Sequence, residues 1–283
     1  MKDFKEDFKN YIEKSKKFIL IVIIFLLLSF GIRLLSNSLS IDTELFMFTS
    51  DALHNTWQGM GRWGLVFFNK LIMGNFFLLP FSNLLTFFNI LIYSILINFL
   101  LYSLLNDKNK QFFTKYQFIL TAIFITSPIF AEQYGFTLQN VSVSFSIVLT
   151  SLSLIAFNYY LKSSDKKRNV CILIICVIAT ILSFAVYQAI VPFYIAMVII
   201  CYYLKITNVK SKNNEWKYLF SNICFFLISI VFYYIIAEIL STNVTYLKFG
   251  WVENGLSLTF KYLHDVINKM LSCETIFYNV SYL

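Results

Sequence analysis

Long apolar stretches separated by short polar segments run along most of the chain. A helix needs about 20 apolar residues to cross the hydrocarbon core of a bilayer. The pattern therefore predicts an all-α, polytopic transmembrane helical bundle of about seven spans. The predicted spans are 18–36, 82–105, 116–130, 142–161, 170–187, 189–204 and 218–240.

Composition supports a membrane location and argues against other classes of protein. Charged residues make up 13% of the chain and hydrophobic residues 58%, whereas soluble proteins carry about 25% charged residues. The net charge is +8, but no basic stripe on a folded face is visible, so we expect no nucleic-acid partner. The five Cys are scattered, four of them inside apolar runs, and form neither a disulfide framework nor a metal-ligand spacing.

The basic residues predict the orientation. Most of the 23 Lys and Arg lie before the first span and after the second, fourth and sixth spans. The positive-inside rule places these segments, and with them the N-terminus, in the cytoplasm. Segments 37–81 and 129–140, the Tyr187–Gln188 turn and the tail then face outward. We expect the chemistry on that outer face.

We divide the chain into a transmembrane module, 1–240, and an outer interfacial segment, 241–283. In the second part Leu256, Phe260 and Leu263 recur at helical spacing, which predicts a helix in the membrane interface. No further span follows it. We therefore expect either the front part of a longer protein or a short member of its class.

The loop 41–64 is polar, aromatic and rich in acids. Leu53, Trp57 and Met60 recur at helical spacing after an N-cap at 49–51, which predicts a short helix on the membrane surface. A second such helix is predicted over 65–73. The glycines between the two helices let the backbone bend or approach a ligand closely.

Four acids at this boundary are candidate functional groups: Asp42, Glu44, Asp51 and Glu132. A single acid in an outer loop is usually only solvated, but a group of four with few bases nearby favours chemistry. At the edge of low dielectric a carboxylate has a raised proton affinity, which suits a general base. Such acids can also hold a divalent metal, although none is required, and we predict no cofactor.

Arg62 is the one basic residue in the centre of the loop, where positive-inside statistics disfavour it. It either snorkels to lipid phosphate, pairs with an acid, or uses its planar fork to bind a phosphate or diphosphate on a lipid substrate. Trp57 and Trp63 are either interface anchors or stacking surfaces for a sugar ring. All three are candidate substrate-binding residues.

Two more polar turns are predicted at the same rim. Pro128 kinks or ends the third span, and Glu132 and Gln133 follow it. Tyr187 and Gln188 lie between the fifth and sixth spans. These four are also candidate substrate-binding residues. We expect a shared outer cavity that contains Asp42, Glu44, Arg62, Glu132 and Gln188.

These segments together resemble a known family. The runs SIDTE at 40–44 and WQGMGRWG at 57–64, Pro128 with 132–133, and the 187–188 turn resemble the bacterial O-antigen glucosyltransferases of serotype conversion. The resemblance covers the spans from 18 to about 240 and implies an integral membrane glycosyltransferase of the GT-C type. Such an enzyme moves a sugar, here expected to be glucose, from an undecaprenyl-phosphate carrier to a surface polysaccharide, outside the bacterial cytoplasmic membrane.

The resemblance also implies roles for individual residues. Asp42 and Glu44 are the candidates for the general base, with Glu44 first, and Arg62 is a phosphate-side residue. The expected partners are the lipid-linked donor, the polysaccharide acceptor and the bilayer. Two alternatives stay open: a flippase or transporter of lipid-linked sugars, and a non-catalytic partner in polysaccharide assembly. A transporter would place charged residues deep in several spans, and the predicted spans are nearly free of charge at their centres.

Overall fold

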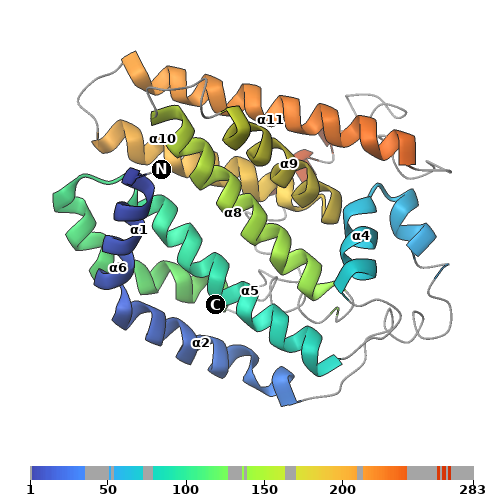
Figure 1. The fold of residues 1–283 in the computed structure, drawn as a ribbon, viewed down its shortest axis with the longest axis horizontal. Coiled ribbons are helices and arrows are strands. Elements are labelled where there is room, and N and C mark those ends of the chain that lie inside the picture. The colour runs from blue at the N-terminus through green and yellow to red at the C-terminus, as the bar shows by residue number, and fades with distance from the viewer. Residues whose placement is uncertain are drawn as a thin grey trace.

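The helices of the computed structural model run side by side in a bundle (Figure 1). Residues 2–35, 51, 54–72, 79–126, 136, 139–162, 170–208, 213–240, 260–261, 263–265 and 267–268 are described. The helices in this part of the chain are α1 (Lys2–Lys14), α2 (Lys16–Leu35), α4 (Trp63–Ile72), α5 (Leu79–Tyr102), α6 (Asp107–Ile125), α8 (Asn140–Lys162), α9 (Val170–Val186), α10 (Ile190–Asn208) and α11 (Asn213–Leu240). The predicted all-α class is thus confirmed for the described residues.

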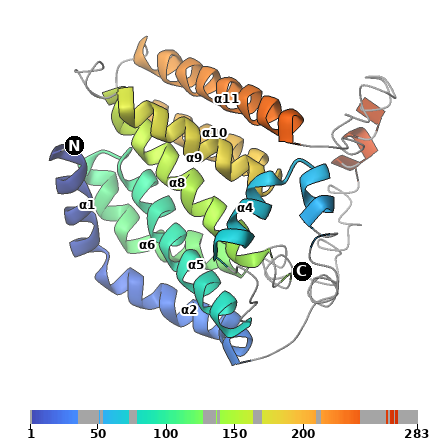
Figure 2. The ribbon, with the colours of Figure 1, turned by 45° about the vertical axis from the view of Figure 1, so that its right-hand side comes forward.

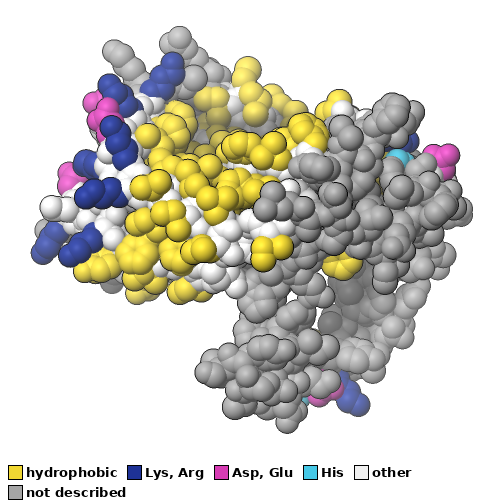
Figure 3. Space-filling model, turned by 90° about the horizontal axis from the view of Figure 1, so that it is seen from below, with side chains coloured by type: hydrophobic (Ala, Val, Ile, Leu, Met, Phe, Trp, Pro, Cys, Tyr) yellow, Lys and Arg dark blue, Asp and Glu magenta, His cyan; other side chains and the backbone are white. Residues whose placement is uncertain are grey.

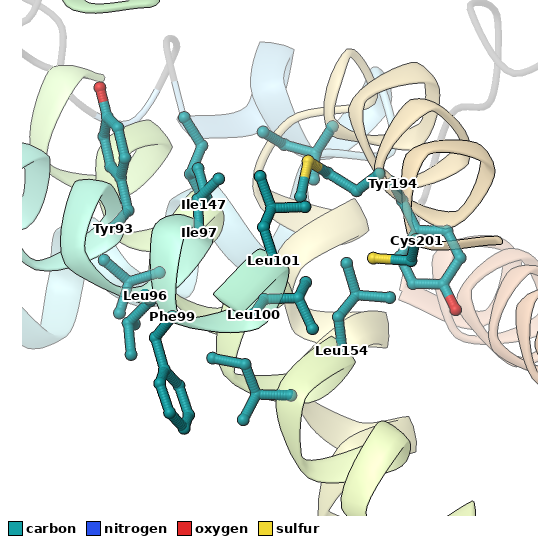
Figure 4. Close-up of a cluster of buried hydrophobic side chains, with 14 of the residues drawn as sticks. Tyr93, Leu96, Ile97, Phe99, Leu100, Leu101, Ile147, Leu154, Tyr194 and Cys201 are labelled. Carbon is teal, nitrogen blue, oxygen red and sulfur yellow. The ribbon is translucent and has the colours of Figure 1, made fainter. Parts of the chain in front are cut away.

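Helices α5, α8 and α9 form the middle of the bundle. In Figures 1 and 2, α2 and α6 lie on one side of them, and α10 and α11 lie on the other. Buried apolar side chains fill the space between these layers. Figure 4 shows part of this core, where Ile97 and Leu100 of α5 lie near Ile147 and Leu154 of α8.

Helix α8 is buried along most of its length because its small polar residues let neighbouring helices approach closely. The Thr150 hydroxyl lies 2.6 Å from that of Ser183 on α9, and the Ser153 hydroxyl lies 2.7 Å from that of Thr180. On the other side, Asn89 of α5 donates to the Ser144 hydroxyl over 3.1 Å. These buried hydroxyl groups of α8 are therefore satisfied by neighbouring helices.

Each of the seven predicted spans overlaps a helix, but the number of spans is not confirmed. Among the described residues, four helices are long and apolar enough to cross a membrane: α5, α8, α10 and α11. The pair α1 and α2, bent by 68°, makes a fifth if it counts as one span. Helix α9 is apolar but short, and α6 begins with the polar stretch DKNKQ. Four or five spans are thus supported, and seven stays a prediction.

Helix α1 covers most of the Lys-rich leader, the segment before the first predicted span, where no helix was predicted. Its apolar face packs on the bundle: the Phe4 ring meets Phe99 and Tyr159 edge-on at centroid distances of 5.8 and 5.3 Å. The Tyr11 hydroxyl donates to Gln117 of α6 over 3.1 Å. The leader is therefore an amphipathic helix that closes one end of the bundle.

One end of the bundle is basic. Figure 3 shows Lys and Arg side chains gathered at one end, beside a broad band of apolar side chains. That end carries α1 and the start of α6, and α4 lies at the opposite end (Figures 1 and 2). Large apolar side chains on the flanks are exposed, such as Leu28, Phe220 and Ile239, as expected for surfaces in contact with lipid. The asymmetry agrees with the predicted topology, and which end faces the cytoplasm stays a prediction.

Candidate functional site

A tight turn sets the position of Arg62. Residues 54–59 are helical, and Gly61 ends this segment in the left-handed region with φ 76°. The Gly61 amide donates to the Gln58 carbonyl and the Arg62 amide donates to the Trp57 carbonyl, both over 2.9 Å. This bonding pattern is a Schellman motif, which favours glycine at the left-handed position. Arg62 is the residue that follows it, and α4 begins directly afterwards.

Helix α4 is seated on α9 by a second glycine. A Cβ built on Gly64 would lie 2.9 Å from the Ala185 carbonyl carbon and 2.9 Å from the Val186 amide nitrogen. Only a residue without a side chain allows this approach. Around the contact, Trp57, Leu65, Val66, Phe68, Val143 and Val186 form a second buried apolar cluster. The turn and α4 are therefore fixed against α8 and α9.

The Arg62 guanidinium is held by the turn between α9 and α10. Its Nε donates to the Gln188 side-chain oxygen over 3.1 Å, across 126 sequence positions. Its Cζ lies 5.0 Å from the centre of the Tyr187 ring, close enough for a cation–π contact. The two terminal NH₂ groups have no hydrogen-bond or ion-pair partner among the described residues. Arg62 thus has a fixed orientation and a donor-rich edge available for an anion.

Gln188 is itself fixed. Its amide nitrogen donates to the Met60 carbonyl over 2.7 Å and to the Tyr233 hydroxyl of α11 over 3.2 Å. The Tyr233 hydroxyl donates in turn to the Gly61 carbonyl over 3.3 Å. Tyr233 was not predicted as a site residue because it lies inside an apolar run. The clue in the sequence that could have identified Tyr233 was the position of its phenol hydroxyl near the predicted outer end of the last span.

A small pocket lies at the same end of the bundle, between α2, α5 and α8. It is lined by Phe30, Leu34, Asn83, Thr86, Phe87, Ile90 and Asn140. Asn140 accepts a hydrogen bond from Ser82 over 2.9 Å. None of the lining residues is charged, so this pocket offers no counter-charge for a phosphate. The Arg62 cluster is the better candidate site for an anionic substrate.

Comparison with known families places this site in context. A family model described as "Glucosyl transferase GtrII" matches residues 31–282, a range that contains Arg62, Tyr187, Gln188 and Tyr233. The chain belongs to this glucosyl transferase family. Searches of curated proteins and of solved structures gave no match.

Membership in the GtrII family implies glucosyltransferase activity, and with it a sugar donor and an acceptor. Together with the apolar helices, it identifies the chain as a membrane protein. The family resemblance expected from the sequence is thereby confirmed.

Five residues of this GtrII-family protein were expected to share an outer cavity. Of these, the structure brings Arg62 and Gln188 together. Asp42, Glu44, Glu132 and Gln133 lie outside the described residues. Asp51 is described and exposed. The catalytic roles of Asp42, Glu44 and Asp51 stay predictions, and so does the expectation that no cofactor is required.

The two tryptophans of the loop have different surroundings. Trp57 is 3% exposed and packs in the apolar cluster under α4. Trp63 is half-buried, and its indole N–H has no acceptor among the described residues. Their roles in substrate binding stay predictions, and Trp63 has the polar group that a substrate oxygen would satisfy.

His54 packs against Trp57, with ring centroids 5.9 Å apart. Burial and the nearby Lys70 lower the pKa of His54 below its usual value, and Asp51 partly opposes the shift. A neutral imidazole is therefore favoured in the folded loop. This position makes His54 part of the support for the turn that carries Arg62.

Proposed function

We propose that this GtrII-family protein transfers glucose from an undecaprenyl-phosphate carrier to a surface polysaccharide, on the outer face of the bacterial cytoplasmic membrane. The observation that carries the proposal is the Arg62 guanidinium. Gln188 and Tyr187 fix its orientation, while its terminal NH₂ groups are without partners among the described residues. A planar fork of this kind matches the geometry of a phosphate and binds it at two points.

The proposed reaction is a single displacement with inversion at the anomeric carbon. A carboxylate takes the proton of an acceptor hydroxyl, whose oxygen attacks that carbon. The bond from the carbon to the phosphate oxygen breaks, and the lipid phosphate leaves with the electron pair. Because phosphate is a good leaving group, the protein mainly positions the two reactants and stabilises the charge on the leaving oxygen. Arg62 supplies that stabilisation.

We assign the base to Glu44 first and Asp42 second, with Asp51 as the third candidate. The assignment rests on the resemblance of the 40–44 and 57–64 segments to the family. The sequence places Glu44 after the first span and 18 positions before Arg62. The GT-C type and the outward orientation rest on the same resemblance, and the gathering of basic residues at the end opposite α4 supports the orientation (Figure 3).

The packing of the bundle favours an enzyme over a flippase. In the described parts of α5, α8 and α9, the charged residue is Lys162, at the end of α8. Buried polar side chains inside these helices are Ser, Thr and Asn, and they bond to one another or to backbone carbonyls. A transport path would be expected to place charged groups there.

The proposal is tested with purified protein in liposomes. Undecaprenyl-phosphate glucose labelled in the sugar is the donor, and polysaccharide extracted from cells lacking the chain is the acceptor. We expect label in the polysaccharide with this donor and none with labelled UDP-glucose. Cells with and without the chain should differ correspondingly in the glucose content of their surface glycan.

Two outcomes would overturn the proposal. Transfer from UDP-glucose at an equal rate would rule out the lipid-phosphate donor. Movement of the labelled lipid across the bilayer without any transfer would make the protein a flippase.

A further inference from the structure

The Tyr233 hydroxyl joins α11 to the two segments that hold Arg62: the turn that ends at Gly61 and the turn that contains Gln188. It donates to the carbonyl of Gly61, the left-handed residue just before Arg62, and accepts from the Gln188 amide nitrogen. The Tyr233 side chain is 8% exposed, so water does not readily replace these bonds. Through this one hydroxyl group, α11 thus bonds both to the turn that precedes Arg62 and to Gln188, which holds Arg62.

This arrangement leaves the Gln188 amide one satisfied orientation. Its two N–H groups have two acceptors, the Met60 carbonyl and the Tyr233 hydroxyl. Its oxygen therefore faces Arg62 Nε. In the flipped orientation the NH₂ group would meet the guanidinium, and two donors would face each other. Tyr233 accordingly selects the orientation of the amide that holds Arg62.

A second contact from α11 reaches the same turn. The Gln58 amide nitrogen donates to the carbonyl of Leu240, at the end of α11. Gln58 also supplies the carbonyl that accepts from Gly61 in the Schellman motif. Segment 58–62 is thus bonded to α11 at two points. Any shift of α11 would move the turn that carries Arg62.

We infer that Tyr233 is a positioning residue for sugar transfer, which acts through Gln188 and Gly61 to aim the Arg62 NH₂ edge at the donor phosphate. The inference rests on the proposed function of Arg62. Tyr233 itself touches no reacting atom. Its loss should therefore matter only as far as the orientation of Arg62 matters.

The test compares Tyr233→Phe in two backgrounds, with labelled undecaprenyl-phosphate glucose as the donor. A single hydrogen bond typically contributes about 0.5–1.5 kcal/mol, which corresponds to about a 2- to 12-fold change. We expect Tyr233→Phe to lower kcat/KM for the donor by about 3- to 10-fold, mainly through KM. In the Arg62→Lys background, where no fork remains to be aimed, we expect a further loss of less than about 2-fold.

Tyr203→Phe is the matched control, because Tyr203 lies 64% exposed on α10 and should leave kcat/KM unchanged. If Tyr233→Phe reduces the amount of folded protein, Gln188→Asn tests the same link, since it keeps the amide but withdraws it from Arg62 by one methylene. Its effect should also shrink in the Arg62→Lys background.

The outcomes separate the two ideas. Equal losses from Tyr233→Phe in both backgrounds would make Tyr233 a purely structural residue. Full activity of Tyr233→Phe beside an impaired Arg62→Lys would overturn the positioning role alone. Full activity of Arg62→Lys would remove the phosphate role of Arg62, and the positioning role with it.

Discussion

Cations lie over tyrosine rings at both ends of the bundle, but the two ends use them differently. At the basic end, Lys205 Nζ lies 3.7 Å from the centre of the Tyr218 ring, and Lys162 Nζ lies 5.1 Å from that of Tyr159. At the opposite end, Arg62 lies 5.0 Å from the centre of the Tyr187 ring. The Arg62 distance falls between the two lysine distances, whereas the remaining contacts of the cations differ between the two ends.

The lysines act as compact charges on flexible stems. Lys162 donates to the Ser103 carbonyl, and Lys110 pairs with Asp107 one helical turn away on the surface. Neither contact fixes a plane. Arg62 is oriented by a side-chain amide in the turn between α9 and α10 and by the Schellman turn before it. A fixed plane suits a directional ligand, so the comparison supports the proposal that the Arg62 end is a recognition end, whereas the lysines anchor the other end.

The comparison is tested most strongly by Glu44→Ala and Asp42→Ala, which remove the two candidate bases of the proposed transfer. General-base catalysis typically contributes about 10²–10⁴-fold, so loss of the true base should remove transfer while the protein stays inserted. The measurement is the glucose content of the surface glycan, normalised to the amount of protein in the membrane. Lys110→Gln at the basic end is the control and should keep transfer within about twofold. Near-normal transfer in both acid variants would move the base to Asp51.

Arg62→Lys sharpens the comparison, because it turns the oriented cation into one like those at the other end. Hydrogen bonds to charged groups contribute about 1.5–3 kcal/mol, so loss of the two-point contact should lower transfer by about 10- to 100-fold. Expression should be unchanged. The reciprocal change, Lys205→Arg, should be tolerated. Full transfer by Arg62→Lys would reduce Arg62 to a lipid anchor.

Gly64→Ala tests whether the seat of α4 on α9 maintains the recognition end. The added Cβ would lie 2.9 Å from backbone atoms of Ala185 and Val186, and overpacking typically costs about 1–3 kcal/mol. Thermal unfolding should occur at a lower temperature, and transfer should fall several-fold as Arg62 moves away from Gln188. Gly31→Ala is the control, since a Cβ at Gly31 meets nothing within 4 Å. Equal stability of the two variants would contradict the close contact.

The sequence was informative about the helices because their apolar runs are long and end at polar residues. The range 142–161 was predicted for α8, which is Asn140–Lys162, and 170–187 for α9, which is Val170–Val186. Helix α1 was missed because its lysines hide the spacing of Phe4, Phe8 and Tyr11. Helix α6 begins earlier than predicted because its first turns are polar, and hydropathy does not detect them.

The site was predictable only in outline. The membrane topology predicted from the sequence placed Arg62 and Gln188 at the same end of the bundle, and the structure places them in contact. The sequence could not distinguish the roles of the two glycines. Gly61 is needed for a left-handed backbone conformation and Gly64 for close helix packing, and both requirements appear in the sequence simply as glycine. Nor could it find Tyr233, because the direction in which a span residue faces depends on how α11 packs against its neighbours.

The smallest expected effect concerns pH and the support of the turn by His54. Its pKa lies below the usual value because of burial and Lys70, so the unfolded chain takes up a proton at a higher pH than the folded one. The stabilisation from neutral His54 is therefore fully present above about pH 6.5, the ordinary histidine pKa, and is lost as the pH falls through the lowered folded-state pKa.

Thermal unfolding in detergent should show the wild type losing stability between neutral and mildly acidic pH more steeply than His54→Gln. The other histidine of the chain, His264, has an exposed side chain, and His264→Gln should leave the wild-type pH dependence unchanged. Identical curves for the wild type and His54→Gln would show that the imidazole does not support the turn that holds Arg62.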